Sequence, residues 1–382
     1  MLTVLVFGLL AALSAVLNLW QWWVARRFPL HQRINGASFV PAVTALKPLK
    51  GCDVETAGCL RSWLEQNYPG QVQILFGVAD ANDAVCEVVR ELIATHPGAQ
   101  ASLVICGESL GANAKVSTLI QLQRCARHEV IIVSDADVRV PADFLANAVA
   151  PLRDPGVGLV SCFYRAANPT TLAMRWEALA INVDFWSQVL QSRSLKPIDF
   201  ALGAVMTTRR AELEAIGGFI VLADYLADDY QLGNLIAKAG KTIALSSVVV
   251  DCWSAPMNWK QVWAHQVRWA RTIRVCQPLP YFFSILSNAT LWPLLWLLIS
   301  PGAISAGCAA LALLVRLATA TDNAIRLSRS FAGASHIWFI WVKDVLQAVV
   351  WANAFVGRII EWRGRRYEVR ADGKLIPFPT RG

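Results

Sequence analysis

The chain has 382 residues, of which 55% are hydrophobic and only 16% are charged. Soluble globular proteins carry about 25% charged residues, so this composition excludes an ordinary soluble protein and indicates that part of the chain faces lipid. The formal net charge is +8. Many basic residues fall in 260–274 and 363–370, beside apolar stretches, where anionic headgroups are the expected neighbours and no nucleic acid is needed.

The first predicted element is a membrane anchor over residues 1–27. Residues 2–24 are largely apolar and uncharged, and Arg26 and Arg27 follow them. This length suits a spanning helix, and the two arginines place its C-terminal end in the cytosol. A secretory signal peptide is the alternative, but the segment has neither a basic start nor a small-residue cleavage site.

Between residues 38 and 257, β-like runs alternate with helical stretches of 10–15 residues. This alternation predicts an α/β domain with a mostly parallel sheet, whose ligands lie at the carboxyl ends of the strands. After residue 165 we expect a helix over 171–192, a short apolar segment at 199–207, a helix at 227–239 and a strand at 242–252. The earlier strands are expected at 39–46, 72–79, 102–106, 130–134 and 157–163, and the helices at 55–66, 83–95, 113–126 and 142–151.

The most informative motif is Asp135-Ala136-Asp137, which ends the apolar run Val130–Ser134. A buried strand that delivers two carboxylates suits a hard divalent cation, because Mg²⁺ and Mn²⁺ prefer oxygen ligands and share themselves with substrate phosphates. A solvated acidic loop is the alternative for this motif taken alone.

Three further motifs lie in the first half of the domain. Lys47–Gly51 is expected to form a turn after the first strand, and Asp80 follows the second strand, where it accepts from a nucleoside or caps a helix. Gly111–Lys115 opens a helix, and backbone amides with a lysine at such a position suit a diphosphate. An exposed helix-start lysine is the plainer interpretation.

The second half contributes Asp228-Asp229 at the start of a helix. In one interpretation one of these acids acts as a general base. In the other they are an N-cap and a first-turn acid, which stabilise the helix by about 1 kcal/mol. Residues 258–278 predict an amphipathic interfacial helix that carries His265, Arg268 and Trp269. Arginine there pairs with phosphate oxygens, or with lipid headgroups.

Residues 279–360 contain apolar stretches at 281–299, 302–320 and 336–357, the last of which includes Lys343 and Asp344. Three crossings after an N-terminal anchor would place the basic tail, residues 361–382, outside the cytosol. We therefore expect one stretch to be interfacial or re-entrant, most plausibly the one with Lys343 and Asp344.

Taken together, the motifs resemble membrane glycosyltransferases of the ceramide glucosyltransferase type, assigned to family 21 and related to family 2. The resemblance covers about residues 40–275 and includes a bacterial sister group associated with hopanoid lipids. It implies a GT-A catalytic domain, a fold of nucleotide-diphospho-sugar transferases, flanked by N-terminal and C-terminal membrane helices. The matching segments are Lys47–Gly51, Asp80, Asp135–Asp137, Ala201–Ala204, Ile216–Phe219, Asp228–Tyr230 and Arg268-Trp269.

The resemblance implies inverting transfer of a sugar from a UDP-sugar to a lipid hydroxyl, with Asp229 as the general base. Mg²⁺ or Mn²⁺ would be held by Asp135 and Asp137. The implied donor side comprises Asp80, Lys115, Asp135, His265 and Arg268, and the implied acceptor side comprises Gly203, Asp228 and Trp269.

The expected reaction is transfer from UDP-glucose to ceramide, as in glycolipid biosynthesis. His265 stands where the family usually has Gln or Arg, which favours as the alternative a hopanoid-associated enzyme that uses UDP-N-acetylglucosamine. A processive polysaccharide synthase, a polyprenyl-phosphate sugar synthase and a scaffold without catalysis are weaker alternatives. We expect an integral membrane protein, with its catalytic domain in the cytosol, in a bacterial inner membrane.

Overall fold

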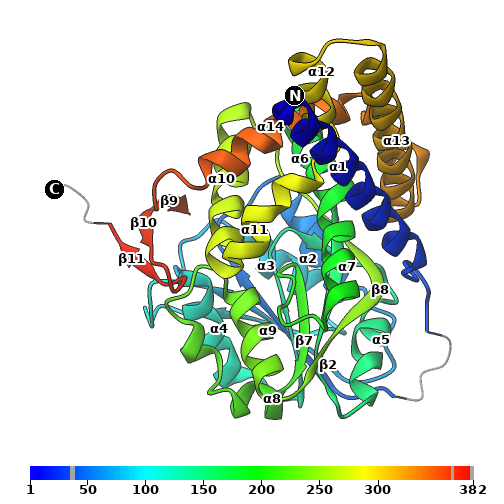
Figure 1. Cartoon of the computed structure of the whole chain (residues 1–382). Coiled ribbons are helices and arrows are strands. Elements are labelled where there is room, and N and C mark those ends of the chain that lie inside the picture. The colour runs from blue at the N-terminus through cyan, green and yellow to red at the C-terminus, as the bar shows by residue number, and fades with distance from the viewer. Residues whose placement is uncertain (35–38, 363–364, 379–382) are drawn as a thin grey trace. The chain divides into compact units, whose positions relative to one another are not determined.

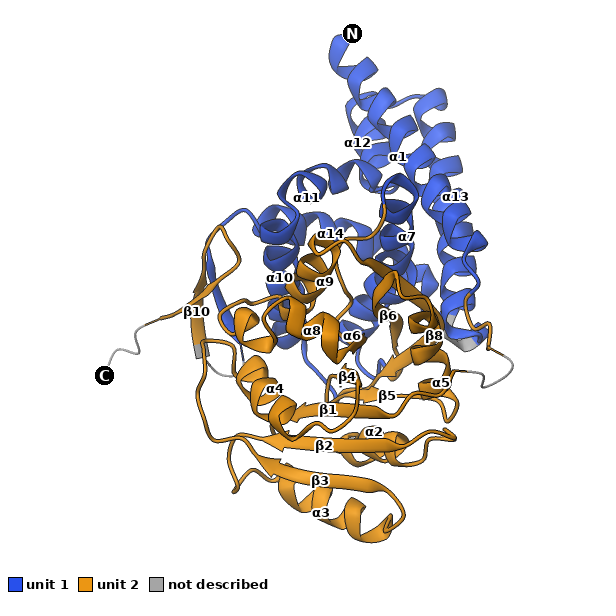
Figure 2. Ribbon diagram, turned by 90° about the horizontal axis from the view of Figure 1, so that it is seen from below, with its two compact units in different colours: residues 1–29, 169–196, 256–364 blue, residues 30–168, 197–255, 365–382 orange. Residues whose placement is uncertain are grey.

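A computed structural model of the chain describes residues 1–34, 39–362 and 365–378. The chain divides into two compact units that are each assembled from separate stretches (Figure 2). The first unit comprises residues 1–29, 169–196 and 256–364, and the second comprises 30–168, 197–255 and 365–382. The expected start of the catalytic domain at residue 38, and residues 363–364 and 379–382 of the expected tail, lie outside the described residues.

The second unit is built on a mixed sheet of eight strands in the order β3-β2-β1-β4-β7-β6-β8-β5. Figure 1 labels β2, β7 and β8 of this sheet. Neighbours among β1 to β4 run parallel, as do β6 and β8, whereas β7 is antiparallel to both β4 and β6. The predicted α/β domain with a mostly parallel sheet is confirmed. The strands are β1 Val43–Leu49, β2 Val72–Val78, β3 Gln100–Ile105, β4 Val130–Ser134, β5 Val138–Arg139, β6 Val157–Ala166, β7 Val205–Arg209 and β8 Thr242–Cys252.

The end of β1 differs from the prediction. Lys47 and Pro48 were expected in a turn, but they lie inside the strand. Proline is tolerated there because β1 pairs with β4 only through Leu46 and continues along β2 alone as far as Leu49. A missing backbone N–H costs little where a strand lacks one of its neighbours.

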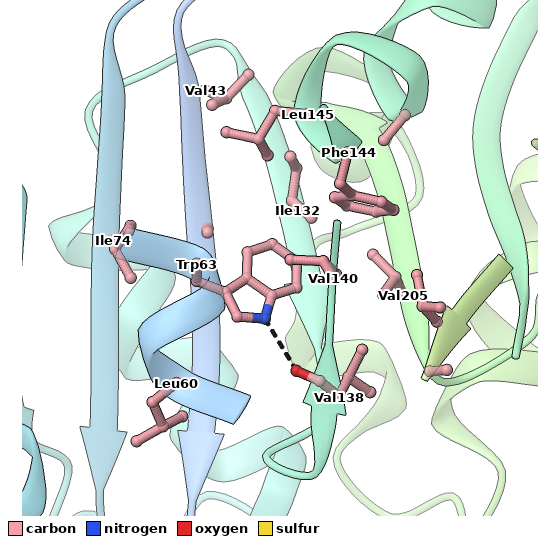
Figure 3. Close-up of a cluster of buried hydrophobic side chains, with 14 of the residues drawn as sticks. Val43, Leu60, Trp63, Ile74, Ile132, Val138, Val140, Phe144, Leu145 and Val205 are labelled. Atoms are coloured by element: carbon pink, nitrogen blue, oxygen red, sulfur yellow. Dashed lines mark hydrogen bonds between the residues drawn. The ribbon is translucent and has the colours of Figure 1, made fainter. Parts of the chain in front are cut away.

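Helices pack against this sheet through a continuous apolar core (Figure 3). Trp63 is buried at its centre, and its indole Nε1 donates to the Val138 carbonyl at 3.1 Å while its ring packs edge-on against Phe144. This bond satisfies the polar atom that a buried tryptophan carries. The helices that contribute to this core are α2 Thr56–Leu64, α3 Val85–Thr95 and α5 Phe144–Val149. The same unit contains α4 Ala114–Cys125, α8 Arg210–Ala215 and α9 Asp228–Lys238, with short 3₁₀ turns at Ala150–Arg153 and Phe219–Leu222.

The last part of the second unit is a β-hairpin, formed by β10 Arg365–Val369 and β11 Leu375–Pro377. We expected only a basic tail over this stretch. Gly373 turns the chain with φ +85°, a conformation that glycine adopts without steric cost. Tyr367, Val369 and Leu375 are buried, so the hairpin has an apolar inner face.

The first unit is helical and contains the apolar segments. Within the described residues two helices are long and apolar enough to cross a membrane, α1 Leu2–Arg27 and α13 Ala303–Ser328, which indicates a membrane protein. A bent pair adds a third crossing if it is one span. The other elements are α6 Leu172–Leu179, the π-helix η2 Ala180–Phe185, α7 Trp186–Leu195, α10 Trp259–Cys276, α11 Pro278–Ser284, η4 Ile285–Ser287, α12 Leu291–Ile299, η5 Phe331–Ala334, η6 Ile337–Phe339, α14 Ile340–Asn353 and β9 Ile359–Trp362.

The stretch expected as one apolar run at 281–299 is broken. The helices over Pro278–Ser287 and Leu291–Ile299 meet at 58°. Asn288 lies at the break, and its side-chain oxygen accepts from the backbone N–H of Leu291 at 2.9 Å, which caps the second helix locally.

Four charged side chains form a buried cluster within the first unit. Arg316 of α13 pairs with Asp184 of η2 at 2.9 Å and with Asp344 of α14 at 2.8 Å, and Lys343 contacts both of these carboxylates. Thr290, next to the break, donates to Asp344 at 2.6 Å. Two cations and two anions leave the cluster without net formal charge, as a buried group of ions requires. The anomalous pair Lys343-Asp344 is therefore part of this helical packing.

Candidate active site

Asp135 and Asp137 follow the carboxyl end of β4, where the sequence placed them. The side chain of Lys47 of β1, which is completely buried, holds the backbone at the end of β4. Its Nζ donates to Ser134 Oγ at 3.0 Å and to the Asp135 carbonyl. Burial lowers the pKa of Lys47 to about 8, although the nearby Asp137 and Asp135 charges oppose this.

A second buried lysine connects this strand end to α9. Lys115 Nζ lies 2.8 Å from Asp135 Oδ1 and 3.2 Å from Asp228 Oδ2. Burial by itself would lower the pKa of Lys115, but the two carboxylates raise it above its usual value, so the lysine stays charged. Lys115 therefore joins two acids that are 93 residues apart in the chain.

The helix start around Lys115 differs from the prediction in one respect. The backbone amides of Lys115 and Val116 are not presented to an anion, because the side chain of Asn113 accepts from both, at 3.0 and 3.2 Å. Asn113 is the N-cap of α4, and such a cap satisfies donors that the helix leaves unpaired. Lys115 is also buried, so the interpretation of an exposed helix-start lysine is wrong.

Asp229 lies beside Asp228 in the first turn of α9, and neither residue is the N-cap, which is Ala227. Burial and, to a smaller extent, the Asp228 charge raise the pKa of Asp229 to about 6, while Lys115 opposes this shift. A carboxylate whose pKa approaches the working pH is suited to accept a proton.

Gly203 faces Asp229 closely. A Cβ atom at residue 203 would lie 2.6 Å from Asp229 Oδ2, which is closer than real contacts allow. The structure thus brings Gly203 and Asp229 together, and it explains why this position carries no side chain.

Asp80 lies at the same edge of the sheet as Asp135. Strands β2 and β4 flank β1 and run parallel to it, so the residues that follow them share the carboxyl edge. Asp80 is exposed and its Oδ1 accepts from Asn82 N at 2.9 Å. It does not cap α3, whose N-cap is Ala84.

The three predicted residues on α10 belong to the first unit. His265 Nδ1 lies 2.7 Å from Glu177 Oε1 of α6, and its ring packs against Trp269 at 4.5 Å between centroids. Gln266 donates to the same carboxylate oxygen at 2.9 Å. The structure thus ties His265 to α6, and the roles implied for Arg268 and Trp269 stay predictions.

The residues at the end of β4 fit a divalent cation. Over the described part of the chain, no three His, Cys, Asp or Glu side chains gather as a protein-only metal site. Mg²⁺ does not need one, because it commonly binds one or two carboxylates and completes its shell with water and substrate phosphates. Asp135 and Asp137 supply two hard oxygen donors at one strand end.

Two residues that shape this site were not singled out by the sequence. Lys47 lay in a recognised motif, but the sequence predicted a turn there, so nothing local indicated that its ammonium group has buried partners. Asn113 carries the usual mark of a helix N-cap, an asparagine just before a helical run. Its second function, a bond from Nδ2 to the Tyr225 carbonyl at 2.8 Å, had no local signal.

The sheet order, with carboxylates at the ends of β2 and β4 and at the start of α9, defines a GT-A domain of the nucleotide-sugar transferase class. The chain resembles a mannosyltransferase from Pyrobaculum calidifontis solved with GDP-Man and Mn²⁺, with a TM-score of 0.53 and 22% identity over 91% of this chain and 99% of that one. This similarity establishes the fold.

The chain matches glycosyl transferase family 21 over residues 4–375 and belongs to that family. The predicted family and the predicted enzyme class, a glycosyltransferase, are confirmed. Ceramide glucosyltransferase 1 of Caenorhabditis elegans is 24% identical over 58% of this chain and 47% of its own length. Ceramide glucosyltransferase 3 of the same organism is 23% identical over 92% of this chain and 78% of its own length.

Bacterial relatives occur as well. An N-acetylglucosaminyltransferase of Bradyrhizobium diazoefficiens is 24% identical over 61% of this chain and 49% of its own length. The chain thus spans about half the length of two of these three relatives and over three quarters of the other.

Proposed function

We propose that the protein transfers a sugar from a UDP-sugar to the hydroxyl group of a membrane lipid with inversion at the anomeric carbon. UDP-glucose and ceramide are the proposed donor and acceptor, because a relative matched over 92% of this chain is named a ceramide glucosyltransferase. The observation that carries the proposal is the connection of Asp135 to Asp228 through Lys115, which brings the strand end beside Asp229.

In the proposed reaction Asp229 is the general base. The acceptor hydroxyl gives its proton to the Asp229 carboxylate while its oxygen attacks the anomeric carbon. The bond from that carbon to the diphosphate breaks on the opposite side, and its electron pair leaves with UDP. The raised pKa of Asp229 supports this role, because the base must be ionised before the attack and protonated after it.

The donor is bound at the carboxyl edge of the sheet. Asp80 is proposed to accept from the uridine, and Asp135 and Asp137 to hold Mg²⁺ or Mn²⁺. A cation in that position supplies positive charge that stabilises the departing diphosphate. Lys47 donates to the backbone carbonyl of Asp135 and so fixes its position. Donor binding therefore does not have to spend free energy on ordering the backbone of Asp135.

The acceptor is proposed to be a lipid because the chain itself resides in a membrane. Helices α1 and α13 keep the enzyme at a bilayer, so a two-chain lipid needs to expose only its headgroup hydroxyl. Arg26 and Arg27 at the end of α1 support a cytosolic location for that end, which is the side on which the catalytic unit would meet UDP-sugars.

A second donor is favoured by two observations. His265 replaces the usual Gln or Arg, and two bacterial relatives are named N-acetylglucosaminyltransferases. UDP-N-acetylglucosamine, with a hopanoid acceptor, is therefore the second candidate pair.

The test is a donor panel. Membranes that contain the protein are incubated with labelled UDP-glucose, UDP-N-acetylglucosamine and UDP-galactose in Mn²⁺, and the lipids are extracted for mass spectrometry. A new glycolipid identifies both substrates together. If the wild-type protein transfers none of these sugars to any lipid, the proposed function is wrong.

The variant Asp229→Asn tests the base. Its turnover should fall by about 10²–10⁴-fold, the usual contribution of general base catalysis, while UDP binding in Mn²⁺ is kept. The matched control is Asp154→Asn, an exposed acid in a turn of the same unit that should leave turnover unchanged. If Asp229→Asn and Asp154→Asn had equal turnover, a residue other than Asp229 would have to accept the proton of the acceptor hydroxyl.

A further inference from the structure

The C-terminal hairpin, residues 365–378, pairs with a short segment that precedes α9. Leu375 N donates to the Asp224 carbonyl at 2.7 Å, and Leu226 N donates to the Gly373 carbonyl at 3.1 Å. Tyr225 forms an antiparallel bridge with Lys374. The Lys374 ammonium also lies over the Tyr225 ring, 5.5 Å from the ring centroid. The hairpin thus gains residues 224–226 as an added strand, in the way that sheet edges bind extended peptides.

The same segment is bonded on its other side to the start of α4. Asn113 N donates to the Ala223 carbonyl at 2.8 Å, and Ala112 N donates to Asp224 Oδ1 at 2.9 Å. The approach is close, because a Cβ atom on Gly111 would lie 2.5 Å from the Ala223 carbonyl oxygen. Residues 223–226 are therefore held between α4 and the hairpin.

This segment leads directly into the acids of the candidate site. Only Ala227 separates Leu226 from Asp228, and Asn113 donates from Nδ2 both to the Tyr225 carbonyl at 2.8 Å and to Asp228 Oδ1 at 3.4 Å. Asp228 pairs with Lys115, and Asp229 lies against Gly203. A displacement of residues 224–226 therefore moves the first turn of α9.

Residues 223–227 lie between the 3₁₀ turn Phe219–Leu222 and α9 and belong to no helix or named strand. A connection of this kind has no ladder of its own, so its position depends on partners from elsewhere in the chain. Two of these backbone bonds come from the hairpin. A misplacement of about 1 Å in catalytic groups costs up to about 100-fold in rate.

From these contacts we propose that the C-terminal hairpin is a positioning element of the transferase, which holds residues 224–226 and thereby presents Asp228 and Asp229 to the acceptor. This inference rests on the proposed function. In this proposal the hairpin acts through the acids and not by contact with a substrate, so its loss should affect turnover rather than donor binding.

The test compares two adjacent residues of β11. Leu375 is 4% exposed and Ile376 is 44% exposed, so Leu375→Asp places a charge in the buried face and Ile376→Asp does not. We expect Leu375→Asp to lower kcat by about tenfold to hundredfold, with the donor KM and the affinity for UDP in Mn²⁺ unchanged. Ile376→Asp should keep the kcat of the wild type, and the conservative Leu375→Ile should restore it.

Limited proteolysis reports whether the hairpin has detached. Trypsin cleaves after Arg370 and Lys374, and both sites should be cut faster in Leu375→Asp than in Ile376→Asp. If Leu375→Asp loses UDP binding altogether, Leu375→Ala replaces it, because this variant removes packing without adding a charge.

The outcomes separate the two claims. A wild-type protein that transfers no sugar refutes the proposed function. A wild-type protein that transfers sugar, together with a Leu375 variant that is cut in its hairpin and keeps full kcat, refutes the positioning role. A lowered kcat with an equal loss of UDP affinity also refutes it, since the hairpin would then only support the fold.

Discussion

The substitution Gly203→Ala is a direct test of Asp229, because the three atoms nearest to the added Cβ all belong to this side chain. The new Cβ would lie 2.6 Å from Asp229 Oδ2, 3.2 Å from its Cγ and 3.4 Å from its Cβ. Gly203 does not need a positive φ, so alanine fits its backbone and the effect is confined to the contact.

The size of the effect follows from this distance. The Oδ2 atom has to retreat by about 0.8 Å before its contact with the methyl group reaches 3.4 Å, the lower limit of ordinary van der Waals contact. Misplacement of a catalytic group by about 1 Å costs up to about 100-fold in rate. We therefore predict that Gly203→Ala lowers kcat by about tenfold to hundredfold.

The assay measures transfer from a saturating UDP-sugar at a fixed lipid concentration, with UDP affinity in Mn²⁺ determined separately. Gly98→Ala is the matched control, because a Cβ atom there has no neighbour within 4 Å. A Gly203→Ala enzyme with the kcat of the wild type and normal UDP affinity would contradict the reasoning, since Asp229 could then move without consequence.

Three further predictions concern pH, metal and the buried charges. Because Asp229 must be ionised to accept a proton and its pKa is raised to about 6, kcat/KM should fall about tenfold per pH unit below pH 6; a rate that is constant down to pH 5 would argue against this base. Removal of divalent cations with EDTA should abolish transfer and added Mn²⁺ should restore it, while Asp135→Asn should raise the Mn²⁺ concentration needed for half-maximal rate; full activity in EDTA would contradict the metal site. Arg316→Met should lower the free energy of unfolding in detergent by about 3–5 kcal/mol, because Asp184 and Asp344 would keep Lys343 as their one shared cation. Arg326→Met removes a partly exposed pair and should cost less than about 1 kcal/mol, so equal losses would mean that the cluster is unimportant.

Much of the fold was predictable because the strands are continuous apolar runs. Val130–Ser134 was located to the residue, and Asp135 was placed correctly at its end. The end of β1 was not, because Lys47 and Pro48 locally indicate a turn. Their place in the strand depends on distant partners, since Lys47 Nζ donates hydrogen bonds to acceptors at residues 134 and 135.

The candidate site was predictable as a set of acids but not as a network. The motifs indicated Asp135 and Asp229 separately, because each lies at the end of a strand or the start of a helix. The connection between them depends on Lys115, whose partners lie 20 and 113 residues further along the chain. No periodicity in the sequence reports a contact of that kind.

The hairpin and the charge cluster were missed for the same reason. Residues 365–369 and 375–377 are too short to indicate strands by alternation, and their pairing with residues 224–226 is set by tertiary contacts. Lys343 and Asp344 were noticed as anomalies in an apolar stretch. Their partners Asp184 and Arg316 could not be named without the packed helices.

The order in which the segments of the second unit are synthesised has a consequence for its biogenesis. Residues 256–364 belong to the first unit and leave the ribosome before the hairpin does. A nascent chain therefore completes its transferase domain only after its hydrophobic helices have been made and offered to the insertion machinery. Premature termination among those helices yields a protein that still has every acid of the site and lacks the strands that pair with residues 224–226.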